Sequence, residues 1–77
     1  MIPIPRCRVL LAPTNGRLAH ALPDRTLVAA GDVVATVDTP RGPRSLHAPR
    51  AGRVGGALVG ASHPVAAGEG VVWLDVA

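Results

Sequence analysis

An internal repeat is the feature of this sequence that most constrains its fold. The segment "LAPTNGRL", residues 11–18, matches "HAPRAGRV", residues 47–54, at an offset of 36 residues. The segment "VAAGDVVATVD", residues 28–38, matches "VAAGEGVVWLD", residues 65–75, at an offset of 37 residues. Self-similarity at a fixed offset is the signature of duplicated structural units, and two units are too few for a solenoid. The repeat therefore predicts one compact body with approximate two-fold symmetry.

The two halves, residues 8–39 and 45–76, fill a chain of 77 residues. A chain of this length forms one domain, so we predict a single unit over residues 1–77. The one cysteine, Cys7, excludes an intrachain disulfide, which fits a reducing compartment. The chain does not begin with a charged segment followed by an apolar stretch, as a secretory leader would. These observations predict a cytoplasmic protein that does not cross a membrane.

Short apolar segments between turn residues predict an all-β fold. The longest stretch without glycine or proline runs from Asp32 to Thr39, which is too short for an amphipathic helix. Trp73 is the only aromatic residue, so valine, leucine and alanine must fill the core. Closely spaced short strands favour a sandwich or barrel. We predict strands at Arg8–Leu11, Thr26–Val28, Val33–Asp38, Ser45–His47, Arg53–Leu58 and Val71–Val76.

Glycine and proline mark the turns between these strands. Gly16 and Gly52 are expected to supply positive φ angles after Ala-Pro pairs that end strands. Gly31 and Gly68 are expected in turns that lead into the next strand. The link Thr39–Arg44, "TPRGPR", has the Pro-x-Gly chemistry of a hairpin turn. It places Arg41 near the tip of the central hairpin, and the two-fold symmetry places this tip far from both termini.

The ordered motifs resemble a known family. The sequence has "AP-x-x-G", then "V-x-x-G-D-x-V", a hairpin, "AP-x-x-G-x-V" and "V-x-x-G-x-x-V" between about Arg8 and Leu74. This order resembles the biotinyl/lipoyl attachment domains, which are carriers in biotin-dependent carboxylases and 2-oxoacid dehydrogenases. The resemblance implies a flattened β-barrel, or barrel-sandwich hybrid, of two four-stranded sheets related by a pseudo-two-fold axis. This architecture agrees with the repeat.

The sequence departs from this family at the residue that matters most. The family attaches its prosthetic group to a lysine at the tip of the central hairpin, and the resemblance puts that lysine on Arg41. Pro40 and Gly42 replace the flanking residues that are usual in the family. All eight basic residues of the chain are arginines, and a protonated guanidinium does not form the amide that holds biotin or lipoate. The sequence therefore predicts no biotin or lipoate on this chain and no other cofactor.

Three function hypotheses follow. The first is a non-catalytic accessory or interaction subunit of a carboxylase or acyl-transfer type of enzyme system. Its protein partner would be a carboxylase, dehydrogenase or synthase subunit, contacted through Arg41, Arg44 and Arg50. The second is a small-molecule unit of a biosynthetic pathway, in which guanidinium groups hold a carboxylate or phosphate without a covalent bond. The third is a degenerate carrier. Edge strands also leave a homo-oligomer open.

Other functions find little support in the sequence. Nucleic-acid binding is disfavoured, despite a net charge of +3, because no reading helix or set of stacking aromatics accompanies the arginines. His20, His47 and His63 lack metal-ligand spacing. Ser62 precedes His63, but no acid or nucleophile motif accompanies the pair. The sequence therefore predicts no enzyme and no metal site.

Three single residues have ordinary structural interpretations. Cys7 lies between two arginines, which favours a reactive thiol, although a plain strand residue is the simpler alternative. Asp32 and Glu69 occupy equivalent repeat positions, and turn capping explains both better than acid–base catalysis. Trp73 is expected to pack within the last strand.

Overall fold

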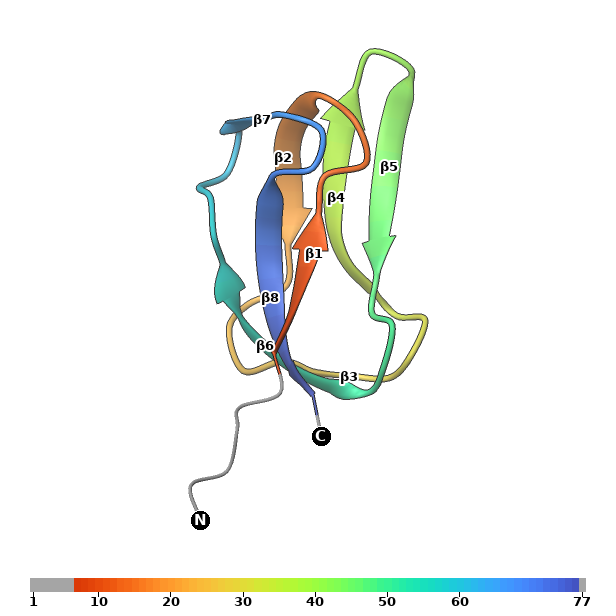
Figure 1. Ribbon diagram of the computed structural model, residues 1–77, viewed down its shortest axis with the longest axis vertical. Coiled ribbons are helices and arrows are strands. Elements are labelled where there is room, and N and C mark those ends of the chain that lie inside the picture. Colours follow the sequence, from red (N-terminus) through yellow and green to blue (C-terminus); the bar gives the residue numbers. More distant parts are fainter. Residues whose placement is uncertain (1–6, 77) are drawn as a thin grey trace.

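The computed structural model describes residues 7–76, which form eight β-strands (Figure 1). Among these residues, no helix is long and apolar enough to span a membrane. The strands are β1 (Cys7–Leu11), β2 (Gly16–Ala21), β3 (Leu27–Val28), β4 (Val33–Thr39), β5 (Gly42–His47), β6 (Gly52–Ala57), β7 (Pro64–Val65) and β8 (Gly70–Val76).

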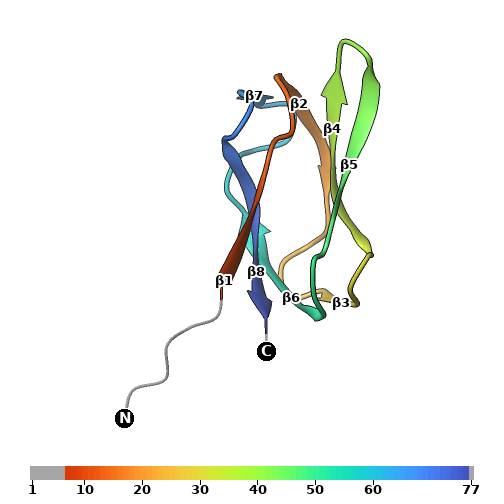
Figure 2. The same cartoon turned by 45° about the vertical axis from the view of Figure 1, so that its right-hand side comes forward.

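The strands form two antiparallel four-stranded sheets that face each other (Figure 2). Sheet A has the strand order β1-β8-β6-β3, and sheet B has the order β5-β4-β2-β7. Advancing every strand of sheet A by four positions along the chain gives sheet B in the same order. Each half of the chain therefore contributes two strands to each sheet. The predicted all-β fold of two four-stranded sheets with internal two-fold symmetry is confirmed, and the two sheets form a flattened sandwich that does not close into a barrel.

Equivalent irregularities in the two halves bring adjacent residues into the core. Between β4 and β5, Val33 lies opposite His47 and Ala35 opposite Leu46, which leaves Val34 without a direct partner. Between β1 and β8, Leu10 lies opposite Val72 and Leu11 opposite Gly70, which leaves Val71 without a direct partner. The bulges are thus formed by Val34 and Ala35 in one half and by Val71 and Val72 in the other. A β-bulge of this kind redirects one side chain. All four bulge residues are completely buried, so each bulge adds one apolar side chain to the interior.

The described core is built only from small aliphatic side chains, as the composition predicts. It lies between the two sheets, and its members come from both halves of the chain in nearly equal number. They are Ala12, Leu18, Val28, Val34, Ala35, Val37, Leu46, Ala48, Val54, Val65, Val71, Val72, Leu74 and Val76.

The six predicted strands are present with small shifts at their ends, but two strands were missed. The missed strands are β2 and β7. The sequence of β2, "GRLAHA", contains no β-branched residue, and β7 has only two residues, of which the first is proline. The repeat itself contained the missing signal for β2, because an offset of 36 maps β6 onto it.

The prediction that Gly16 and Gly52 adopt positive φ angles is wrong. Positive φ angles at glycine occur instead at Gly31, Gly42, Gly56 and Gly68. Gly16 and Gly52 start strands that pass very close to a neighbouring strand. A Cβ atom on Gly16 would overlap the carbonyl oxygen of Asp38, and one on Gly52 would lie 2.5 Å from the carbonyl oxygen of Asp75. These glycines allow close approach of two backbones.

Candidate functional site

The central hairpin ends in the two-residue turn Pro40–Arg41, because β4 continues to Thr39 and β5 begins at Gly42. This turn lies at the end of the molecule opposite the last residue of β8, as predicted (Figure 1). We call β4, β5 and this turn the tip hairpin. The predicted link Thr39–Arg44 is therefore shorter than expected, since its outer residues belong to the strands.

Pro40 determines the geometry of this turn. Proline fixes φ near −65°, whereas the primed turns preferred by two-residue hairpins need a positive φ at the first central residue. The positive φ falls on Gly42 instead, at 109°. A tight turn followed by a glycine of this kind is the pattern of a hairpin with a glycine bulge. Arg41 therefore sits in a turn with a locally fixed backbone.

The hydroxyl of Thr39 holds this turn together. Its Oγ1 donates a hydrogen bond to the carbonyl oxygen of Gly42 at 2.7 Å. The same oxygen accepts a hydrogen bond from the backbone N–H of Arg41 at 3.2 Å. These bonds replace part of the ladder at the end of the hairpin. The guanidinium of Arg41 is thus presented to solvent from an ordered backbone.

Arg44 lies near Arg41 on the inner side of the tip hairpin. Along β5, Arg44 precedes the buried Leu46 by two residues, so both side chains leave the same face of the strand. The residue opposite Arg44 on β4 is Val37, which is completely buried. The inner face of the hairpin therefore changes from an apolar surface to a cationic one towards the tip.

One surface hollow collects these groups. It is lined by Thr14, Thr39, Pro40, Arg41 and Arg44. Thr14 comes from the β1–β2 connection, which lies at the same end of the molecule as the tip hairpin (Figure 1). The lining residues include two arginines and Thr14, and no carboxylate of the described residues lines the hollow. The hydroxyl of Thr39 already donates its hydrogen to the carbonyl oxygen of Gly42. The chemistry of the hollow suits an oxyanion.

Arg50 does not belong to this surface. It lies in the turn between β5 and β6, at the opposite end of the molecule from the tip (Figure 1). In the repeat, the position of Arg50 is equivalent to that of Thr14. The structure thus brings Arg41 and Arg44 together and leaves Arg50 apart. Sequence analysis missed Thr14 and Thr39, because the two meet only through the fold.

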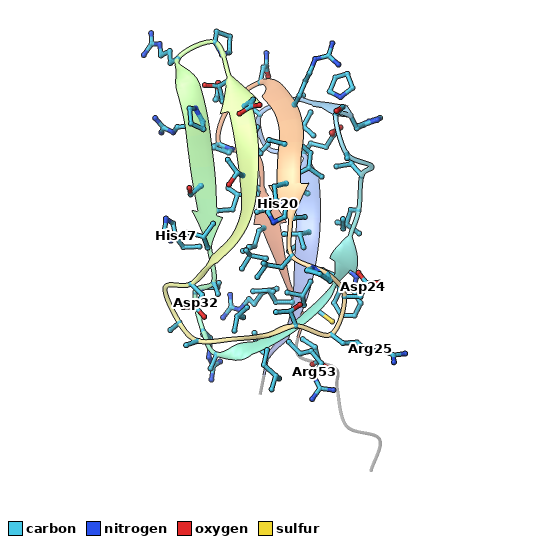
Figure 3. The ribbon with its side chains drawn as sticks, turned by 180° about the vertical axis from the view of Figure 1, so that it is seen from behind. His20, Asp24, Arg25, Asp32, His47 and Arg53 are labelled. Atoms are coloured by element: carbon cyan, nitrogen blue, oxygen red, sulfur yellow. The ribbon has the colours of Figure 1, made fainter. Side chains whose placement is uncertain are left out.

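The histidines and the turn acids are distributed over separate elements. His20 lies on β2 and His47 on β5, where its Nδ1 is 3.0 Å from the carbonyl oxygen of Gly31 (Figure 3). Within residues 7–76, no three His, Cys, Asp or Glu side chains gather in a group suited to a metal ion. Asp32 caps a turn as predicted, since its Oδ2 accepts the backbone N–H of Ala29 at 2.8 Å. At Glu69 the backbone N–H donates to Ala66 O at 2.9 Å, and the carbonyl oxygen accepts from the N–H of Ala12 at 2.8 Å.

Cys7 and Trp73 both belong to sheet A. Cys7 is exposed at the start of β1, and the neighbouring Arg6 lies outside the described residues. Trp73 lies on β8 as expected and is partly exposed. Its ring lies directly over Gly55, where any Cβ atom would overlap it.

Comparison with known proteins identifies the fold. No family model and no curated protein sequence matches the chain. The chain is similar to part of a single-chain, multi-domain long-chain acyl-CoA carboxylase, with a TM-score of 0.87 and 21% identity over 100% of its length. It is also similar to part of the urea carboxylase of Kluyveromyces lactis, with a TM-score of 0.83 and 23% identity over 96% of its length.

A third similar structure is the product-bound ectoine utilization protein EutE (DoeB) from Ruegeria pomeroyi. Its TM-score is 0.72, at 23% identity over 90% of this chain. The chain spans only 8% and 6% of the two carboxylases and 22% of the third protein. These similarities show that the same fold occurs as a small part of larger proteins.

Proposed function

We propose that this chain is a lysine-free counterpart of the biotinyl/lipoyl carrier domains and serves as an accessory subunit of a carboxylase or acyl-transfer type of enzyme. It would dock through its tip hairpin without carrying a prosthetic group. The observation that carries the proposal is Arg41, which occupies the turn of the central hairpin in a chain that has no lysine. The same fold within two carboxylases supports the choice of partner class.

The chemistry of the tip favours docking over carriage. Biotin and lipoate are held through an amide on a primary amine, and the guanidinium of Arg41 stays protonated and is a poor nucleophile. Its charge nevertheless remains available for ion pairing with a carboxylate-rich surface. Because Pro40, Gly42 and Thr39 fix the turn, the loss of backbone freedom on docking is small.

A pull-down from the native cell combined with intact-mass analysis tests this proposal. The bait is the tagged chain, with Arg41→Gln as the test variant and Arg50→Gln as a matched control at the opposite end. We expect an unmodified bait that retains a carboxylase, dehydrogenase or synthase chain, with retention lost in Arg41→Gln and kept in Arg50→Gln. An added mass of one biotinyl or lipoyl group would contradict the proposal, and so would equal retention by both variants.

The hollow at the tip supports a second candidate function, the non-covalent binding of a small carboxylate or phosphate. Arg41 and Arg44 line it together with Thr14, Thr39 and Pro40. An NMR titration with inorganic phosphate, against chloride at equal ionic strength, tests this function. Shifts that saturate at residues 14 and 39–44 and disappear in Arg44→Gln are expected. Shifts that are spread equally over all arginines would exclude a built site.

A further inference from the structure

Each position in one half of the repeat can be compared with its equivalent in the other half. This comparison shows which residue types the fold requires at that position. Inner positions are apolar in both halves. Leu10 of β1 corresponds to Leu46 of β5, and Leu74 of β8 corresponds to Val37 of β4. Three of these four residues are buried, and Leu10 packs against the core. Equivalent inner positions of the two sheets therefore contribute in the same way to the core.

The outer faces of the two sheets differ. On sheet A, the outer positions Val9, Leu11 and Trp73 are apolar. Their equivalents on sheet B are polar: Ser45, His47 and Thr36. The same fold thus forms with serine, histidine and threonine at these positions. Val9 and Leu11, which are 49% and 53% exposed, therefore stand at positions where the fold also accepts serine and histidine.

These apolar residues form one continuous surface. Val9 lies directly opposite Trp73 in the register of β1 and β8. A Cβ atom on Gly70 would lie 3.0 Å from Val9 Cγ1 and 3.1 Å from Leu58 Cδ1, so the side chains of Val9 and Leu58 both lie next to this glycine. Leu58 is 51% exposed. We call Val9, Leu11, Leu58 and Trp73 the sheet A patch. The remaining large exposed hydrophobic residues, Leu27 and Val33, belong to β3 and β4.

The sheet A patch reaches an unguarded sheet edge. Among the described strands, β1 pairs only with β8 and forms one edge of sheet A. Its sequence is "CRVLL". The equivalent edge strand of sheet B, β5, begins "GPRS" and carries proline, arginine and serine. Proline and charges protect natural edge strands from pairing with other chains. Of these residues, β1 has only an arginine, because Arg8 is the equivalent of Arg44. The strand β1 therefore lacks most of this protection.

We propose that a second copy of this chain pairs antiparallel with β1, with Val9 of each copy opposite the other. This register puts Cys7 opposite Leu11 of the second copy on the outer face. It puts Arg8 opposite Leu10 of the second copy, so no two like charges are directly opposed. The strand is therefore complementary to itself, and pairing joins the two sheet A patches into one stripe.

The contact between the two copies is small, and both copies carry the same sign of net charge. Edge pairing places only β1, with Val9 and Leu11 on its outer face, next to the second copy. A contact through one five-residue strand is smaller than the roughly 800 Å² per partner of a standard stable interface. Each copy also carries a net charge of +3, which opposes association at low salt. The dimer is therefore weak and reversible, and its population rises with protein concentration. Antiparallel pairing points the two tip hairpins in opposite directions, so the dimer offers two separate tips.

Sedimentation equilibrium over about 5 µM to 1 mM tests this proposal, because a dimer responds to concentration by mass action. Val9→Lys is the test variant, and Ser45→Lys is the matched control at the equivalent position of β5. We expect the wild-type mass to approach that of two chains. We expect Val9→Lys to weaken association by at least tenfold, and Ser45→Lys to leave it unchanged. A monomer at every concentration, or equal effects of both substitutions, would overturn the proposal.

Amide hydrogen exchange of the wild-type chain gives a test that needs no variant. Protection of the backbone N–H groups of residues 7–11 is expected to rise with protein concentration, while that of residues 42–47 stays constant. Protection of β1 that does not depend on concentration would also overturn the proposal. Neither experiment involves Arg41 or an enzyme partner, so its result is independent of the proposed accessory function.

Discussion

At the scale of single residues, a substitution at Arg41 distinguishes most directly between docking on a partner and carrying a prosthetic group. The substitution Arg41→Lys restores the amine that attachment needs, but Pro40 and the Gly42 φ of 109° still set the turn. A misplacement of about 1 Å can slow an enzymatic step by roughly 100-fold. We therefore expect a biotin or lipoate ligase to modify Arg41→Lys about 100-fold more slowly than its own acceptor domain, as measured by intact mass. Modification at the acceptor's rate would show that this tip lost only its amine.

Trp73 and Gly55 form a matched pair whose equivalents in the other half are Thr36 and Ala19. The large residue faces glycine in one half, and a small residue faces alanine in the other. Gly55→Ala puts a methyl group into the indole ring, so we expect a loss of about 1–3 kcal/mol in unfolding free energy. The fluorescence of Trp73, the only aromatic residue, should shift as its ring moves towards solvent.

A double variant distinguishes this clash from a general effect of replacing glycine. Gly55→Ala combined with Trp73→Thr recreates the pair found in the other half. With threonine at position 73, Gly55→Ala should cost little unfolding free energy, because no ring then occupies the Cβ position. Thermal unfolding followed by circular dichroism measures this cost in both backgrounds. If Gly55→Ala costs as much with threonine at position 73 as with tryptophan, the pairing argument is wrong.

At the scale of elements, the close approach of strands depends on Gly16 and Gly52. A Cβ atom at either position would overlap or crowd the carbonyl oxygen of Asp38 or Asp75. Backbone atoms cannot rotate away as a side chain can, so Gly16→Ala and Gly52→Ala should each cost about 1–3 kcal/mol. Urea unfolding followed by Trp73 fluorescence measures both.

Gly60→Ala is the matched control for these variants. Gly60 has open space around its Cβ position and no positive φ angle. Its replacement should leave stability unchanged or raise it slightly, because alanine lowers the entropy of the unfolded chain. A loss at Gly60 equal to that at Gly16 would show that the close approach of strands is not the cause of the loss at Gly16.

The elements also show what the sequence could and could not predict. The repeat predicted the symmetry and the paired sheets, because duplicated residues need equivalent surroundings. The sequence analysis missed β7, whose two residues carry no periodic signal of their own, although an offset of 37 maps β3 onto it. We expected Gly16 in a turn because it follows an Ala-Pro pair. The same short pattern also fits a glycine that lets two strands come close together. The meeting of Thr14 with Arg44 depends on the arrangement of loops around the core, which no short segment contains.

At the scale of the whole molecule, the two-fold symmetry makes the β4–β5 turn equivalent to the gap between β8 and β1. Cys7 and Asp75 are Cα partners, so the described ends of the chain are adjacent. A circular permutant that starts at Arg41 and ends at Pro40, with Ala77 joined directly to Met1, preserves all strand pairings. Residues 1–6 and 77 then serve as the linker, since each extended residue spans about 3.3 Å.

We expect this permutant to keep the backbone NMR pattern of both sheets and to lose about 1 kcal/mol, because a longer loop replaces a two-residue turn. It also divides the tip at Arg41, so partner retention should fall while the fold persists. As a control, new termini between Thr36 and Val37 interrupt the central strand β4, whose Val37 is completely buried, and should abolish folding. If the tip permutant also fails to fold, a continuous β4–β5 turn is needed to form the sandwich. The turn would then have a role in folding in addition to exposing Arg41.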